Sequence, residues 1–257
     1  MARIFITGSS AGLGLMAAQL LISQSHEVVL HGRNQQRADA ALTAAPGAVA
    51  AVTGDLARLS EMRSVADQVN RFGRFDAVIH NAGVGYREAR RIETEDGFPH
   101  VFAINVLAPY ILTALIERPE RLVYLSSGMH YGAGPHLEDL LWTKRPWRGS
   151  EAYAESKLHD VLLAFAVARR WPDVRSNALE PGWVPTRMGG PGAPGDLSKA
   201  HLTQAWLATS EDPLALSTGA YFYHQRSREP NPVTRDERIQ DRLLEACADF
   251  SGVSLAA

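Results

Sequence analysis

The chain has 257 residues, of which 46% are hydrophobic and 21% are charged, a composition typical of globular proteins and unlike disordered, collagen-like or disulfide-rich chains. Its 26 basic and 28 acidic side chains give a formal net charge of −2, which argues against nucleic acid or an anionic membrane as partner. The single Cys247 cannot form an internal disulfide, as expected in a reducing cytoplasm. We therefore expect one cytoplasmic domain over residues 1–257.

Apolar runs of strand length alternate along the chain with longer segments of helical period. The predicted strands are Arg3–Thr7, Val28–His31, Ala48–Val52, Ala77–His80, Leu122–Leu125, Ser176–Leu179 and Ala220–Tyr223. The predicted helices are Leu13–Ser23, Gln35–Ala44, Leu59–Phe72 with Ser60 as its cap, Asp96–Glu117, Tyr153–Trp171 and Arg235–Phe250. Nearly continuous apolar strands separated by helices favour an α/β fold, a doubly wound sheet of about seven parallel strands with helices on both faces.

Three segments need separate interpretation. Met1–Ser23 resembles a weak secretion signal, but its glycines fit a strand, a loop and a helix, and no apolar run in the chain reaches the length of a membrane span. Gly128–Ser150 and Gly182–Asp196 lack a regular period, and each follows a predicted strand. Because long loops in compact domains are usually functional or mobile, we expect both to lie on the ligand side of the sheet.

A glycine-rich loop follows the first predicted strand and opens the first helix. Its sequence is Thr7-Gly8-Ser9-Ser10-Ala11-Gly12-Leu13-Gly14. In this context backbone N–H groups and a helix N-terminus can approach a pyrophosphate, and the last glycine allows close packing of helix and strand. The spacing differs from G-x-G-x-x-G and lacks the G-K-[ST] of a Walker loop, and the pattern alone leaves a merely structural turn open.

Further motifs follow in chain order at the ends of predicted strands and on helices. They are Gly54-Asp55-Leu56, Asn81-Ala82-Gly83, Asn105, Ser127, Tyr153-x-x-x-Lys157 and Pro181-Gly182. Together with the glycine loop, over nearly the whole chain, this set resembles the short-chain dehydrogenase/reductase family, which implies a Rossmann-type fold and a nicotinamide cofactor. The resemblance implies cofactor binding by Gly8, Ser9, Ser10, Gly12, Leu13, Gly14, Asp55, Leu56, Asn81, Ala82, Gly83, Tyr153, Lys157, Pro181, Gly182, Val184 and Thr186. A helix cap at Asp55 and a simple turn at Pro181-Gly182 remain alternatives.

Tyr153 and Lys157 lie about one helical turn apart, so both side chains share one face. A tyrosine pKa of about 10 is too high for efficient proton transfer at neutral pH, and a nearby ammonium together with oxidised nicotinamide would lower it. The resemblance implies that Lys157 also binds the nicotinamide ribose, that Ser127 holds the substrate oxygen, and that Asn105 anchors a water. Ser126 competes with Ser127, because successive strand side chains point to opposite faces; we choose Ser127 by analogy.

The end of the second strand indicates which nicotinamide cofactor is bound. Residues 28–34 contain no carboxylate for an adenosine ribose 2′-hydroxyl. Arg33 stands there instead, and a guanidinium can bind a 2′-phosphate through charge-assisted hydrogen bonds, with Ser9 and Asn34 as further donors. We therefore expect NADP(H), the alternative being that Arg33 is a solvated loop side chain.

Two segments resemble retinol-dehydrogenase-like members of the family. They are Ser126-Ser127-Gly128-Met129-His130, which opens an unusually long connection to Tyr153, and Thr218-Gly219-Ala220-Tyr221-Phe222. His130 and Tyr131 either touch the substrate or lie on a surface loop. The family also implies a homodimer through Asp96–Glu117 and Tyr153–Trp171, although this C-terminal segment could alter such contacts.

The expected function is that of an NADP(H)-dependent oxidoreductase that interconverts a ketone or aldehyde with an alcohol, mainly as a reductase. Apolar residues in the irregular segments and the 200–216 region suggest an apolar small-molecule substrate; they include Met188, Leu197, Leu202 and Trp206. Trp142, Trp147 and Trp183 either line that pocket or pack in the core. Two alternatives remain, a sugar-type epimerase or dehydratase of the same superfamily and a non-catalytic NADP-binding regulator. No metal is expected, because no metal-ligand motif occurs.

Overall fold

One eight-stranded sheet organises the fold in a computed structural model that describes residues 1–256; Ala257, the last residue of the predicted domain, lies outside the described residues. The strand order is β3-β2-β1-β4-β5-β6-β7-β8. The strands are β1 (Arg3–Ile6), β2 (Glu27–Gly32), β3 (Ala50–Thr53), β4 (Ala77–His80), β5 (Arg121–Leu125), β6 (Arg175–Glu180), β7 (Tyr221–Tyr223) and β8 (Arg226–Arg228). Strands β1 to β7 pair in parallel, which confirms the predicted doubly wound α/β fold.

The eighth strand is absent from the sequence-based prediction. It pairs antiparallel with β7, and all three of its residues are exposed. His224 and Gln225 join the two strands with φ values of 48° and 60°, as a two-residue hairpin turn requires. Because β8 carries polar side chains and buries no apolar face, it has no hydrophobic alternation by which it could be recognised.

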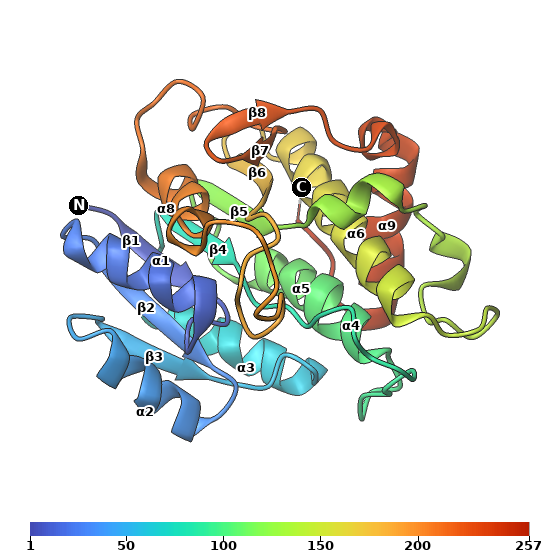
Figure 1. Cartoon of the computed structure of the whole chain (residues 1–257), viewed down its shortest axis with the longest axis horizontal. Helices are drawn as coiled ribbons and strands as arrows, with labels where there is room; N and C mark the ends of the chain where they lie inside the picture. Colours follow the sequence, from blue (N-terminus) through green and yellow to red (C-terminus); the bar gives the residue numbers. More distant parts are fainter. Residues whose placement is uncertain (257) are drawn as a thin grey trace.

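Helices cover both faces of the sheet (Figure 1). The helices packed on one face are α1 (Gly12–Ser23), α2 (Gln35–Ala44) and α8 (Leu202–Thr209), preceded by the short α7 (Leu197–Ala200). Those on the other face are α3 (Leu59–Asn70), α5 (Ala108–Leu115) and α6 (Gly149–Arg170), with α9 (Glu237–Ser251) packed against α5 and α6. Within residues 1–256, no helix has both the length and the apolar character of a membrane span.

The predicted helix Asp96–Glu117 is divided into three parts. The short α4 (His100–Phe102) leads into a π-helix over Ala103–Leu107, and α5 follows. Gly97 has a φ of 84°, which delays the helix start, and Pro109 has no N–H for the carbonyl of Asn105 four residues earlier, which favours the wider π turn.

The other helix boundaries agree with the prediction to within a few residues, but the predicted cap on α3 is wrong. Ser60 lies inside α3, where Arg58 is the N-cap residue and makes no side-chain cap bond. Instead, the N–H of Leu59 donates to Asp96 Oδ2 at 2.9 Å. A cap supplied from a distant residue cannot be read from a local pattern.

The helices predicted to form a homodimer are covered by the chain itself. Almost every residue of α6 between Ala152 and Val167 is buried, and α9 packs along it. Within the described residues, α6 therefore presents no broad exposed face for that dimer.

Candidate active site

The predicted site residues come together at the carboxyl ends of neighbouring strands, where ligands bind in open parallel sheets. The glycine loop follows β1, and Asn81 to Gly83 follow β4. Ser127 comes after β5, and Pro181-Gly182 comes after β6. The segment from Gly182 to Asp196 has no regular structure and lies in front of these strand ends (Figure 1).

The glycine loop has a backbone that only glycine fits well. Gly8 and Gly12 have φ values of 63° and 58°, in the left-handed region. A Cβ on Gly14 would lie 2.4 Å from Asn81 Nδ2 and 2.8 Å from the carbonyl oxygen of Gly8. Asn81 Nδ2 itself donates to the carbonyls of Thr7 and Gly8, at 2.9 and 3.2 Å. The loop is thus held between α1 and the end of β4.

This crowding makes Gly14→Ala a test of the loop. We expect it to lower the free energy of unfolding by about 1–3 kcal/mol, as overpacking does, because both the amide of Asn81 and a backbone carbonyl would have to move. Gly132→Ala is the matched control, since its Cβ would meet nothing within 4 Å and should change stability by no more than about 0.5 kcal/mol. Equal denaturant midpoints for the two variants would contradict this account.

The N-terminus of α1 can accept an anion. Helix α1 begins at Gly12 after the N-cap residue Ala11, without a side-chain cap within residues 1–256 and without an acidic residue in its first turn. Its first N–H groups and its dipole therefore favour a phosphate. Ser9 is fully buried, however, and its hydroxyl donates to the carbonyl of Ile6 at 2.9 Å. Its one proton is used there, so its side chain is not a phosphate donor.

His31 is a structural partner of the glycine loop that the sequence analysis did not identify. Its Nδ1 accepts from the N–H of Gly8 at 3.0 Å, and its Nε2 lies 2.9 Å from the carbonyl oxygen of Gly54. Because Nδ1 accepts, Nε2 must carry the proton and donate. Burial lowers the pKa of His31, which keeps the ring neutral in this role. The feature of the sequence that could have identified His31 is its place at the end of an apolar strand.

The three predicted catalytic side chains converge between β5 and α6. Ser127 lies near enough to Tyr153 to act on the pKa of its phenol, and Lys157 Nζ lies 5.8 Å from the centroid of the Tyr153 ring. The hydroxyl of Ser126 is buried and donates to the main-chain carbonyl of Lys157 at 2.7 Å, so its proton is already used. This placement favours Ser127 over Ser126 for contact with a substrate.

Burial dominates the titration of Tyr153. It raises the pKa of the phenol, whereas the charge of Lys157 and the nearby Ser127 act to lower it and the charge of Asp160 acts to raise it. The net direction is upward from 10, the reverse of the lowering expected from Lys157 with bound nicotinamide. The groups of the protein alone therefore hold Tyr153 in its protonated form.

Asn105 lies fully buried in the π-helix and clamps the loop after β4. Its Oδ1 accepts from the N–H of Val84 at 2.8 Å, and its Nδ2 donates to the carbonyl of Val84 and to Ser156 Oγ, at 3.1 and 2.9 Å. Both amide protons are thus used. The predicted role of Asn105 in anchoring a water stays a prediction.

His130 stabilises the backbone at Ser127. It is fully buried, and its Nε2 accepts from the N–H of Asn231 at 3.2 Å, so its Nδ1 carries the proton and donates to the carbonyl of Ser127 at 2.7 Å. The expectation of a surface loop is therefore wrong for His130. It holds for Tyr131, which is 43% exposed.

The remaining predicted cofactor residues differ in what their side chains contact. Leu56 packs in the core, and Asp55 Oδ1 accepts from the N–H of Ala57 at 3.0 Å. Asn34 Oδ1 caps α2. Arg33 is exposed, and within residues 1–256 no hydrogen bond or ion pair engages its guanidinium.

The segment after β6 is folded on itself and reaches the loop after β4. Trp183 Nε1 donates to the carbonyl of Gly189 at 3.0 Å, and the N–H of Gly189 donates to Thr186 Oγ1 at 3.1 Å. Met188 packs so close to Gly85 that a Cβ there would lie 2.7 Å from its Cγ. Met188 is thus the predicted pocket residue that lies beside the candidate site.

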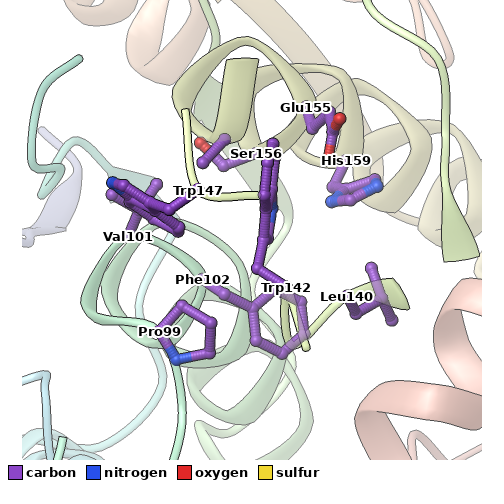
Figure 2. Close-up of a pocket in the computed structure, with 10 residues that line it drawn as sticks. Pro99, Val101, Phe102, Leu140, Trp142, Trp147, Glu155, Ser156 and His159 are labelled. Carbon is purple, nitrogen blue, oxygen red and sulfur yellow. The ribbon is translucent and has the colours of Figure 1, made fainter. Parts of the chain in front are cut away.

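Other predicted pocket residues lie elsewhere. Trp142 and Trp147 enclose a cavity of about 10 Å³ between the 128–150 segment and α6, with Phe102 on its far side (Figure 2), which is room for about one water. Leu202 and Trp206 line a separate groove of about 360 Å³ between α1 and α8. Neither space includes Ser127, Tyr153 or Lys157.

Comparisons with known proteins agree with this geometry. A family model described as short chain dehydrogenase matches residues 2–120. The chain is 42% identical to an uncharacterized oxidoreductase from Emericella nidulans and 40% identical to the short-chain dehydrogenase chry4 from Gibberella zeae, over 99% of every chain. It is 30% identical to a Streptomyces protein, DnrU, assigned as a daunorubicin C-13 ketoreductase, over 97% of this chain and 92% of that one. A crystal structure of an uncharacterized protein from Mycobacterium paratuberculosis has a TM-score of 0.87 at 24% identity, covering 100% of this chain and 96% of that one.

Proposed function

This chain belongs to the short-chain dehydrogenases, and we propose that it is an NADP(H)-dependent oxidoreductase that reduces a ketone or aldehyde to an alcohol. The observation that carries the proposal is the convergence of Tyr153 and Lys157, both on α6, with Ser127 just after the end of β5; Lys157 Nζ lies 5.8 Å from the centroid of the Tyr153 ring. The similarity to a protein assigned as a ketoreductase supports the direction. So does the raised pKa of Tyr153, because a proton donor must hold its proton.

The residues around the site fit a dinucleotide. The uncapped N-terminus of α1 would hold its pyrophosphate, and Gly8 and Gly14 leave the space that side chains would fill. A bound nicotinamide would supply the hydride for the carbonyl carbon. Tyr153 donates a proton to the carbonyl oxygen, and Ser127 holds that oxygen through its hydroxyl. The charge of Lys157 acts on the pKa of Tyr153. Two of its three N–H donors are used by the carbonyl of Leu125 and by Asp160, so one is left for the ribose.

The domain, the substrate and the location are proposed on the same basis. One continuous sheet supports a single dinucleotide-binding and catalytic domain over residues 1–257. Exposed Trp183, together with Met188 beside the site, supports an apolar small-molecule substrate. The buried free thiol of Cys247 supports a cytoplasmic location.

The test is a screen of NADPH consumption against a panel of ketones, aldehydes and quinones. We expect turnover with apolar carbonyl compounds, and a loss of it in Tyr153→Phe. NADPH binding without turnover of any carbonyl compound or corresponding alcohol would instead favour a non-catalytic regulator. Turnover of a nucleotide sugar without net cofactor oxidation would favour an epimerase.

The cofactor preference is tested by Arg33→Ala. A charge-assisted contact contributes about 1.5–3 kcal/mol, so the variant should bind NADPH roughly 10- to 150-fold more weakly and NADH almost unchanged. Isothermal titration with both cofactors measures this, and NADH serves as the internal control. Equal weakening of both would mean that Arg33 does not read the 2′-phosphate, and no weakening of either would leave it as a solvated loop side chain. Gly32→Asp is unsuitable as a companion, because a Cβ there would lie 2.5 Å from the backbone nitrogen of Ala38.

A further inference from the structure

Lys157 is paired with a second buried charge. Asp160 lies three residues further along α6, and its Oδ2 accepts from Lys157 Nζ at 2.8 Å. Their side chains are 5% and 3% exposed. Lys157 Nζ also donates to the carbonyl of Leu125, the last residue of β5, at 2.8 Å. An ammonium has three donors, so these two bonds fix its position and leave one donor for a ligand.

We propose that Asp160 is a positioning residue for proton transfer at Tyr153: its carboxylate fixes the Lys157 ammonium beside β5 and cancels part of the positive charge that acts on the phenol. The proposal rests on the proposed function, in which Tyr153 is the proton donor. None of the sequence motifs described above includes Asp160.

The first consequence of the pair concerns the charge of Lys157. Burial lowers the pKa of this ammonium, but the charge of Asp160, the charge of Tyr153 and the hydrogen bond to Asp160 together outweigh burial, and the net pKa is raised. Burial raises the pKa of Asp160 to about 7, with Lys157 acting in the opposite direction. Asp160 and an ionised Tyr153 both favour the charged form of Lys157, so the ammonium keeps one anionic partner while the phenol of Tyr153 titrates in a variant without Asp160.

The second consequence concerns Tyr153. The positive charge of Lys157 lowers the pKa of the phenol, and the negative charge of Asp160 raises it. When both partners are ionised the pair has no net charge, and its effect on Tyr153 is smaller than that of a lone ammonium. The phenol then keeps its proton at neutral pH, as reduction of a carbonyl requires.

The groups around Asp160 contain no second carboxylate among the described residues that could take this role. Tyr124 on β5 faces Asp160, and burial and the Asp160 charge both raise the pKa of its phenol. Its hydroxyl lies 2.7 Å from Thr113 Oγ1 on α5, which lies 3.0 Å from His80 Nε2 on β4. Burial lowers the pKa of His80 to about 3, so this histidine is neutral. Lys157 is therefore the cation that Asp160 faces.

The proposal is tested by titrating the phenol of Tyr153 directly. The phenolate absorbance of the wild-type protein minus that of Tyr153→Phe isolates this residue among the 7 tyrosines, and the same subtraction is made in an Asp160→Asn background. We expect Asp160→Asn to move the Tyr153 transition to lower pH by about 1 unit or more, the usual size of a nearby charge effect. An unchanged transition, or one moved to higher pH, would overturn the proposal.

Glu155→Gln is the matched control, because it also neutralises a buried carboxylate of α6 that forms an ion pair, with Arg145 at 2.7 Å. It should leave the Tyr153 transition in place. Should Asp160→Asn fail to fold, Asp160→Ser removes the same charge and is titrated instead. The readout needs no substrate, so a protein that shows the shift but reduces no carbonyl compound would overturn the proposed function and not the role of Asp160.

Discussion

Tyr153→Phe should lower turnover by about 10²-fold or more while leaving the affinity for NADPH within a few-fold of the wild-type value. The substitution removes only the hydroxyl that is proposed to donate the proton. The glycine loop and Lys157 remain in place to bind the cofactor. Steady-state kinetics with an accepted carbonyl substrate, together with NADPH titration, measures the two effects separately.

Tyr110→Phe is the control for loss of a buried tyrosine hydroxyl. That hydroxyl donates to the carbonyl of Val253 at 2.9 Å, outside the site, so the variant should lose some stability and keep its turnover. If Tyr153→Phe kept its turnover as well, proton donation by Tyr153 would be wrong. A large loss of NADPH affinity would instead assign Tyr153 to cofactor binding.

Most of the fold could be predicted from the sequence, because strands buried on both faces are continuous apolar runs. Helix α2 and strand β4 have the predicted bounds, Gln35–Ala44 and Ala77–His80. The misses have non-local causes. Asp96 caps α3 from a distant loop, and Pro109 acts on the carbonyl of Asn105 only once a helix has formed.

The sequence predicted which residues form the candidate site, but it did not predict most of the contacts that these residues make. Motif spacing placed Ser127, Tyr153 and Lys157 on adjacent elements, but it gave no information on how burial would change the pKa of Tyr153. Ser9 illustrates the same limit, because its hydroxyl bonds to the backbone at Ile6 and His31. These hydrogen-bond partners depend on how separate strands and loops pack together. The hydrophobic periodicity of the sequence gives no information on that packing.

The burial of the Lys157 ammonium beside Tyr153 also has a consequence for stability. Lys157→Ala removes the partner of Asp160 and leaves a carboxylate whose side chain is 3% exposed. Removing one member of a buried ion pair typically destabilises a protein by about 3–5 kcal/mol. We therefore expect Lys157→Ala to lower both the free energy of unfolding and the affinity for NADPH, as denaturant melts and cofactor titration will show.

The double variant Lys157→Ala with Asp160→Asn separates the two roles of the lysine. Once the carboxylate is neutral, no unpaired charge is buried, so the double variant should be more stable than Lys157→Ala alone. Its turnover should stay low, because the ammonium beside Tyr153 is still missing. If the second substitution restored turnover together with stability, the rate loss in Lys157→Ala would come from unfolding, and Lys157 would have no direct part in the reaction. If stability did not recover, the ion pair with Asp160 would not be the reason that Lys157 is needed for folding.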